Sequence, residues 1–395
     1  MRTPKSVHLQ KGFSLIEIMV GLAIGMATVI IMMQMLSNAE ASKRISAGGN
    51  DAQTNATMAL YSLERDIRAS GYGMNSLSIV GCNLSFTPIN ETGPATVQIA
   101  PTAINPPNPN NPNNPLLPLG DAHTDTLLLM YGNGDGSSEG DPLVAISSSG
   151  VYQTSTPTFY QAGNVLIAQN AVRPSPTCTL GVDSVTALSG SSINVNPGVS
   201  GLPVGSLIFN LGNAPVIHAY AIRNGNLTMC DYTAYDCSKS SHASDPAVWV
   251  QVASNVVALR AEYGHDNTNL AAAPPTMTGV VGTYDQTTPG SPSDTSGLPV
   301  YCSWARAMSV RVAVVARSNS YDKSTTPSPT QNTPTWSGST VSTTVPTNPA
   351  AVTFDLSGNA SWQQFRYKTL ETTVPLRNAI WQGGQTTYQG GASGC

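Results

Sequence analysis

Hydrophobic residues form one unbroken run near the start of the chain. Residues 13–36 read FSLIEIMVGLAIGMATVIIMMQML, and as a helix they would extend about 36 Å, enough to cross the roughly 30 Å hydrocarbon core of a bilayer. The segment before it, residues 1–12, carries Arg2, Lys5 and Lys11 and no acid. We therefore expect the start of the helix to face the cytoplasm and the rest of the chain to lie outside.

A helical pattern continues over residues 37–70. Apolar side chains recur at spacings typical of one helix face: Ala56, Leu60, Leu63 and Ile67. Charged residues are expected on the opposite, solvent face: Glu64, Arg65, Asp66 and Arg68. We expect one helix from 13 to about 70, with a weak point at Gly48-Gly49-Asn50 and a stop at Gly71 and Gly73.

Short apolar or alternating segments predict a β-rich head over residues 71–395. The expected strands are 125–131, 164–169, 191–195, 206–210, 216–222, 248–263, 308–317 and 363–376. A short helix is an alternative for residues 254–262, because their apolar positions also fit a 3.6-residue period. Segments rich in Pro, Ser, Thr and Asn predict loops at 101–119, 266–299 and 319–350.

These elements predict an α+β fold. The second half of the long N-terminal helix would pack on an antiparallel β-sheet, within one enlarged, loop-rich head. No internal repeat is evident.

Composition narrows the possible functions. Only 10% of the residues are charged, whereas about 25% is usual, and the formal net charge is −4. With 18 Lys and Arg residues in 395, direct nucleic-acid binding is not predicted. Only one segment is long and apolar enough to span a membrane, which excludes a multi-span transporter.

Three interpretations compete for the N-terminus. A secretory signal would be cleaved after small residues, and Ala39-Glu40-Ala41 offers such a site. However, the apolar run is too long for a secretory signal. A plain membrane anchor would bury Glu17, and an acid deep in a bilayer costs roughly 2.5–3.5 kcal/mol. The third interpretation gives this acid a role.

Residues 11–17, Lys-Gly-Phe-Ser-Leu-Ile-Glu, resemble the processing site of type IV prepilins. The resemblance implies that a prepilin peptidase cuts between Gly12 and Phe13, and that Phe13 is then N-methylated. It also implies that Glu17 pairs with the N-terminal amine of a neighbouring subunit during assembly. Gly21 and Gly25 form a GxxxG pattern, which permits close helix packing but is also common in membrane helices.

Two further stretches are similar to the PilW group of minor pilins. Residues 56–75 share its Leu-x-x-Asp-Ile-Arg pattern followed by Gly-Tyr, with Ser70 where Ala is usual. Residues 372–378, TTVPLRN, are similar to its closing strand. The resemblance implies a type IV pilin-like fold, in which 1–12 is the leader, 13–36 the transmembrane and polymerisation half of the helix, 37–70 its amphipathic half, and 71–395 a periplasmic or extracellular head.

The implied function is a minor pilin that helps initiate and cap type IV pilus assembly, supporting twitching motility, adhesion or DNA uptake. Its implied partners are the prepilin peptidase and other minor and major pilins, with a tip adhesin and the inner-membrane assembly platform as further candidates. The protein would be a single-pass inner-membrane protein first and a pilus component at the cell surface later. The alternatives are a type II secretion pseudopilin and a membrane-anchored ligand-binding module.

All six cysteines follow the apolar run and would face an oxidising compartment: Cys82, Cys178, Cys230, Cys237, Cys302 and Cys395. Cys230 and Cys237 are the best local candidates for a disulfide, while the other four allow several pairings. Cys395 is a candidate for tying down a Gly-rich tail. A zinc site is the alternative, but the chain has no CxxC spacing.

The sequence contains no common catalytic motif, and we expect neither an enzyme nor a cofactor. Four scattered histidines follow the leader, and each is expected on the surface or in a strand: His123, His218, His242 and His265. Five acids predict a loose acidic patch: Asp121, Asp125, Asp135, Glu139 and Asp141. Their spacing does not fit an EF-hand calcium loop, so a solvated turn is the preferred interpretation and no metal site is predicted.

Overall fold

The computed structural model describes residues 12–74, 76–175, 178–268, 270, 277–319, 334–339, 354–359, 361–378 and 395. The predicted leader, residues 1–12, therefore lies outside the described residues except for Gly12, and so does most of the predicted loop 319–350.

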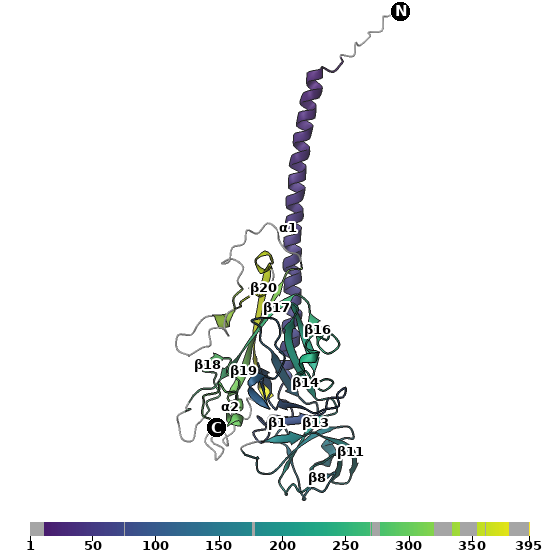
Figure 1. Ribbon diagram of the computed structural model, residues 1–395, viewed down its shortest axis with the longest axis vertical. Helices are drawn as coiled ribbons and strands as arrows, with labels where there is room; N and C mark the ends of the chain where they lie inside the picture. Colours follow the sequence, from purple (N-terminus) through teal and green to yellow (C-terminus); the bar gives the residue numbers. More distant parts are fainter. Residues whose placement is uncertain are drawn as a thin grey trace, which may run out of the picture.

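One continuous helix, α1 (Leu15–Ala69), runs for 55 residues, which corresponds to about 83 Å. Its first half projects from the head, and its second half is embedded in it (Figure 1). The predicted weak point at residues 48–50 is wrong, because the helix continues through it. Gly48 lies where α1 enters the head, and a Cβ there would come within 3.1 Å of the Ser318 Cβ.

Two sheets flank the embedded half of α1 (Figure 1). The first has the strand order β16 (Val250–Ala253), β15 (Asn226–Asp231), β14 (Val216–Arg223), β6 (Leu127–Tyr131) and β3 (Thr102–Ile104). The second has the order β18 (Thr283–Asp285), β17 (Val256–His265), β19 (Ala307–Arg317) and β20 (Tyr367–Pro375). All pairings within these two sheets are antiparallel, and the α+β class predicted from the sequence is confirmed.

Strand β19 shows why the centre of the second sheet is mostly apolar on both faces. Alternate side chains of a strand point to opposite faces, and here Val310, Val312 and Val314 join the core that contains α1. Ala313 and Val315 face the other way, into a smaller cluster that includes Trp336 and other residues from beyond β19. Burial on both faces explains why residues 256–262 belong to strand β17 and not to the alternative short helix, while residues 254–255 form the turn between β16 and β17.

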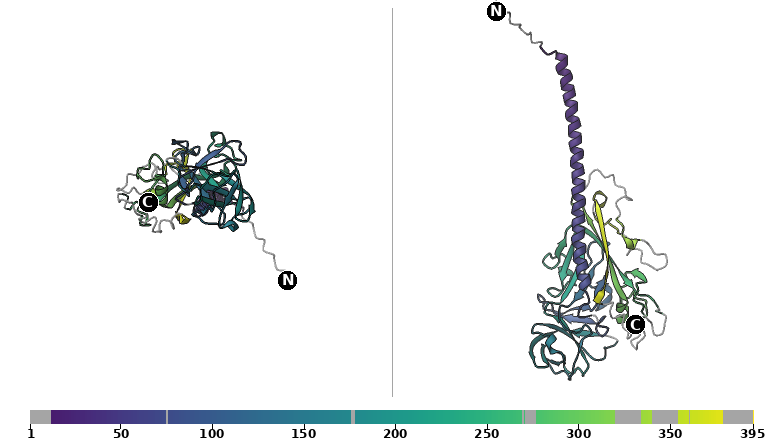
Figure 2. Two further views of the ribbon diagram at one scale, coloured as in Figure 1. Left: turned by 90° about the horizontal axis from the view of Figure 1, so that it is seen from below. Right: turned by 180° about the vertical axis from the view of Figure 1, so that it is seen from behind.

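A third sheet forms a small barrel at the end of the head opposite the free end of α1, as both side views show (Figures 1 and 2). Its order is β7 (Asp141–Pro142), β13 (Leu207–Gly212), β9 (Val165–Gln169), β11 (Asp183–Ser189), β12 (Ser192–Asn196) and β8 (Val151–Gln153). A bridge between Leu143 and Thr154 joins the two outer strands and closes the ring. Closure leaves no free strand edge for unintended pairing.

Smaller elements connect these layers. A three-stranded sheet joins β10 (Thr179–Gly181), β1 (Asn83–Phe86) and β2 (Ala95–Gln98), and a ribbon joins β4 (Pro107–Asn108) and β5 (Asn111–Pro115). The pairing of β1 with β10 is parallel. The described residues also include helix α2 (Val300–Ala305) and short 3-10 turns at 157–159, 240–242, 337–339 and 362–364.

The predicted loop at residues 101–119 is partly wrong. Thr102–Ile104 lie between Pro101 and Pro106, keep their N–H groups and pair with β6. The following prolines lie in the exposed β4–β5 ribbon, an edge position where a missing N–H is tolerated. The predicted loop 266–299 likewise contains strand β18, which pairs with β17.

Each of the eight predicted strand segments overlaps a strand of the structure, and 248–263 overlaps two, β16 and β17. Several strands were not predicted, among them β1, β2, β8, β11 and β15. Most of these are short or strongly polar, as in Asp-Ser-Val-Thr-Ala-Leu-Ser of β11, so no hydrophobic alternation marks them.

Three disulfides join the six cysteines: Cys82–Cys178, Cys230–Cys237 and Cys302–Cys395. The first ties the strand region around β1 to the segment that leads into β10. The third ties Cys395 to α2, so the structure places Cys395 against the head as the sequence suggested.

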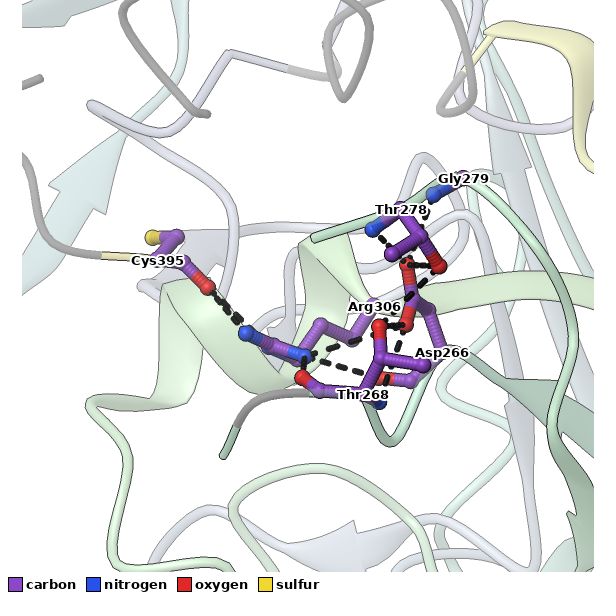
Figure 3. A network of polar contacts seen from close by, with 6 residues as sticks. All are labelled: Asp266, Thr268, Thr278, Gly279, Arg306 and Cys395. Atoms are coloured by element: carbon purple, nitrogen blue, oxygen red, sulfur yellow. Dashed lines mark hydrogen bonds and ion pairs between the residues drawn. The ribbon is translucent and has the colours of Figure 1, made fainter. Parts of the chain in front are cut away.

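A buried arginine reinforces the attachment of Cys395 (Figure 3). Arg306 Nε and Nη2 donate to the main-chain oxygen of Cys395 at 3.0 and 2.6 Å, and Nη1 donates to the main-chain oxygens of Asp266 and Thr268, both at 2.9 Å. The Asp266 carboxylate in turn accepts main-chain N–H groups of Thr278 and Gly279, at 2.7 and 2.8 Å. Three chain segments are thus held by one hydrogen-bond network.

We predict that the two long-range disulfides contribute more to stability than the local one. Cys82 and Cys178 are separated by 96 positions and Cys230 and Cys237 by 7; loop closure then gives about 4.7 and about 2.5 kcal/mol, respectively. Urea unfolding of the C82A/C178A and C230A/C237A double variants measures both losses. Equal losses, or a larger loss for the local pair, would contradict the prediction.

Candidate functional site

The N-terminal half of α1 is uncovered. Every described side chain from Leu15 to Ala47 is exposed, including the large aliphatic ones. This exposed arm, residues 15–47, is about 50 Å long. Within the described residues, one helical stretch, Leu15–Glu40, is long and apolar enough to cross a membrane, and none of it is buried by the rest of the chain.

The predicted processing junction lies just before this arm. Gly12, Phe13 and Ser14 are non-helical and exposed, and the Phe13 side chain is 86% accessible. The helix begins at Leu15, and the Ser14 main-chain N–H donates to Glu17 Oε2 at 3.0 Å. Glu17 therefore caps the first turn of its own helix, where a negative charge is favourable.

Gly21 and Gly25 lie one helical turn apart on the arm. A Cβ at either position would meet no atom within 4 Å. The head therefore does not use these glycines for packing, and the shallow surface that they leave is open to another helix.

The embedded half of α1 is fastened to the first sheet by a buried carboxylate. Asp66 is fully buried; its Oδ2 lies 2.7 Å from His218 Nδ1 and accepts the Tyr220 hydroxyl, also at 2.7 Å. Its Oδ1 accepts the Tyr131 hydroxyl at 3.3 Å and Arg65 Nη2 at 3.1 Å. We call these five residues the Asp66 cluster.

The protonation of the Asp66 cluster follows from its contacts. Burial raises the pKa of Asp66, but hydrogen bonds from His218 and Tyr220 outweigh it and hold the pKa below its ordinary value of 3.8. Burial and the neighbouring carboxylate raise the pKa of Tyr131 to about 12. At neutral pH, Asp66 is therefore a carboxylate that accepts hydrogen bonds from neutral tyrosines.

The sequence interpretation placed Asp66 on the solvent face of the helix, and this is wrong. Ala59, Leu63 and Ile67 are fully buried, and Asp66 lies three residues after Leu63 and seven after Ala59, on the same helix face. That spacing was a usable indication of burial. Its partners on β14 and β6 could not be identified from the sequence, because they depend on tertiary pairing.

The C-terminal end of α1 is capped from the far end of the chain. Asn378 Nδ2 donates to the main-chain oxygens of Ala69 and Ser70, at 3.1 and 2.9 Å, which satisfies carbonyls that a helix end leaves unpaired. Gly71 follows with φ of +80°, a conformation that favours glycine. The two stretches that carry the PilW resemblance, 56–75 and 372–378, thus meet at the end of α1.

The predicted acidic patch at 121–141 is not one patch. Asp125 is buried with Arg260 Nη1 at 2.9 Å, Asp141 accepts the Tyr160 hydroxyl at 2.6 Å, and Asp121 accepts main-chain N–H groups of residues 224 and 225. These carboxylates serve separate structural contacts. Within the described part of the chain, no group of three or more His, Cys, Asp or Glu side chains is arranged to hold a metal ion.

Comparison with known proteins gives two matches to family models. Residues 219–378 match the model described as Type IV Pilus-assembly protein W, and residues 8–33 match the Prokaryotic N-terminal methylation motif. Searches of curated proteins and of solved structures found no significant match. One match contains the Gly12–Phe13 junction and Glu17, and the other contains the helix cap Asn378.

We predict that Asp66→Ala lowers the free energy of unfolding by about 2–4 kcal/mol, because buried donors lose a charged acceptor. Glu64→Ala is the matched control; its ion pair with Arg68 is partly solvent-exposed and is worth less than about 1 kcal/mol. Urea unfolding of the full chain in detergent measures both values.

The stabilisation that Asp66 provides should depend on pH. Because the pKa of Asp66 is lowered in the folded state, its contribution is complete above the ordinary value of 3.8 and is lost as the pH falls through the folded value. The difference in the free energy of unfolding between wild type and Asp66→Ala should therefore become smaller below about pH 4. A difference that is small at neutral pH, or that grows on acidification, would contradict this role.

Proposed function

Because this chain is a PilW-type, type IV pilin-like protein, we propose that it is a minor pilin that helps to initiate and cap the assembly of type IV pili. Twitching motility, adhesion or DNA uptake would depend on it indirectly, through the pilus. The families that its segments match are generally structural, and the proposed mechanism is templated helix packing without a chemical step.

The exposed arm carries this proposal. Its aliphatic side chains, such as Ile16 at 68% and Met32 at 73% accessibility, have no covering from the head. In water this surface would be unfavourable, so the arm needs lipid before assembly and other helices after it. A single-pass inner-membrane location with the head in the periplasm, followed by incorporation into a surface pilus, satisfies this need in both states.

Cleavage at the predicted junction between Gly12 and Phe13 would produce the mature N-terminus of the exposed arm. Gly12 and Phe13 precede the helix and are exposed, so a prepilin peptidase would meet a non-helical, accessible backbone there. Cleavage would leave Phe13 as the new N-terminus and the substrate for N-methylation. Because the helix begins at Leu15, removal of the leader would leave α1 intact.

Glu17 would then select the position of each neighbour. One of its oxygens accepts the Ser14 N–H, and no described residue donates to the other. In apolar surroundings a carboxylate and an ammonium each need a partner. The Phe13 amine of an adjacent subunit supplies that partner and fixes the axial register, while Gly21 and Gly25 allow the helices to approach closely.

The opposite end of the molecule supports contacts with further proteins. The barrel segment, residues 141–212, contains three charged residues, Asp141, Arg173 and Asp183, and both acids are buried. Aliphatic side chains such as Ile146 and Val204 are exposed there. A membrane-distal surface with so little charge suits contacts with other minor pilins or a tip adhesin, while the assembly platform would meet the membrane end.

We predict that Glu17→Ala leaves cleavage and membrane level unchanged but reduces incorporation into pili by at least about tenfold, because the lost ion pair is desolvated. Glu40→Gln, an exposed acid on the same arm, is the matched control and should incorporate normally. Immunoblots of membrane and sheared pilus fractions measure both.

Normal piliation with Glu17→Ala would refute the pairing role of Glu17. Deletion of the protein distinguishes a minor pilin from a type II secretion pseudopilin, because loss of a pseudopilin would block protein secretion and leave surface pili unchanged. Loss of a membrane-anchored ligand-binding module, the other alternative, would leave both unchanged.

A further inference from the structure

A polar cavity lies at the end of the head from which α1 emerges. Its volume is about 260 Å³, and it is lined by Asp121, Ala122, Asn224, Gly225, Arg317, Gly358 and Asn359. Arg317 is the last residue of β19, and the next residue, Ser318, faces Gly48 at the entry of α1 into the head. The cavity is separate from the Asp66 cluster and from the network around Arg306.

Arg317 has an unusual set of contacts for a partly buried guanidinium. No residue in the described ranges accepts a hydrogen bond from its side chain, and its Nε is buried from solvent without a partner. The guanidinium stacks on the Phe365 ring, with Cζ 4.7 Å from the ring centroid. The stacking restrains the position of the charged group, while its hydrogen-bond donors stay unused.

The other charged residue that lines the cavity, Asp121, already accepts two main-chain hydrogen bonds. Asp121 Oδ1 accepts the Asn224 N–H at 2.9 Å, and Oδ2 accepts the Gly225 N–H at 2.7 Å. These bonds fix the tight turn at 224–225, where both residues have positive φ. Asp121 therefore holds the cavity wall in place, and no ion pair joins it to Arg317 among the described residues.

We propose that this cavity binds a carboxylate through Arg317. A guanidinium presents two parallel N–H donors that match the two oxygens of a carboxylate, and such charge-assisted pairs are stronger than neutral hydrogen bonds. Because the Nε of Arg317 is closed to solvent, the carboxylate would pair with the two terminal nitrogens, Nη1 and Nη2, whose N–H groups also form a parallel pair. The site does not depend on the proposed role in pilus assembly.

The size of the cavity limits the ligand. Sites for drug-sized molecules and cofactors usually occupy about 300–1,000 Å³, so 260 Å³ suits a group the size of an amino-acid side chain. Two sources share this chemistry: an acidic side chain of another protein subunit, and a small free carboxylate. The amide side chains of Asn224 and Asn359, which also line the cavity, are available for its remaining polar atoms.

Calorimetric titration of the full chain in detergent tests the site with N-acetylglutamate, and with N-acetylglutamine as the neutral analogue of the same shape. Wild type should bind the acid and not the amide. Arg317→Gln should weaken acid binding at least about tenfold, the effect of losing one charge-assisted contact. Lys368→Gln removes an exposed charge from neighbouring β20 and should bind like wild type.

Absence of binding to wild type, equal binding of acid and amide, or unchanged binding by Arg317→Gln would each overturn the proposal. Arg317→Lys keeps the charge but not the paired donors, so it should also weaken binding, and the thermal unfolding midpoint shows that each variant is folded. A photo-crosslinking residue at position 359 identifies the source: an adduct with a pilus subunit that Arg317→Gln abolishes indicates an acidic side chain, and binding without an adduct indicates a free carboxylate.

Discussion

The exposed arm of α1 is the constraint on which the rest of the molecule depends. A helix with apolar residues on all sides is stable in lipid or among other helices but is a liability in water. Every described side chain in residues 15–47 is exposed, and the head packs against the remainder of α1. The head therefore anchors the C-terminal half of α1, while lipid or other helices would cover its N-terminal half.

The head contacts α1 through small buried residues where the helix enters, and through polar groups near the C-terminal end of the helix. Ala52, Ala56 and Ala59 are fully buried and let the sheets approach the helix closely. Further along, the Asp66 cluster ties α1 to β14 and β6, and Asn378 caps its last carbonyls. A force on the arm would thus be transmitted to two sheets and to the closing segment, while the barrel, which has a separate apolar core, stays remote from the junction.

Much of this was predictable from the sequence, because it rests on local pattern. The uninterrupted apolar run and the i, i+4 spacing predicted α1, and strongly apolar segments such as 308–317 predicted the central strands. The failures have physical reasons. The burial of Asp66 depends on partners from β14 and β6, which lie far from it in the sequence. The polar strand β11 is stabilised by pairing with its neighbour β12 and not by hydrophobic alternation. The glycines at 48 and 49 predicted a helix break, but the helix continues through them and Gly48 lies close to Ser318, whose Cβ would be 3.1 Å from a Cβ at position 48.

The same limit applies to the sites. The residues at the Gly12–Phe13 junction and Glu17 form a contiguous motif, so the sequence identified them together. The Asp66 cluster and the Arg317 cavity assemble residues from distant segments, and no spacing rule finds them. The charged residues are unevenly distributed along the chain. The barrel segment, residues 141–212, carries three of them, whereas residues 64–68 alone carry four.

The identity of the mature N-terminus tests the central claim most directly. Mass spectrometry and N-terminal sequencing of the protein, taken from membranes and from sheared pili, would show which residue begins the processed chain. The account predicts N-methylated Phe13 in both fractions, with the whole exposed arm retained. A chain that begins at Ser42 would show cleavage as a secretory signal, and one that keeps Met1 would show a plain anchor; either result would contradict the account.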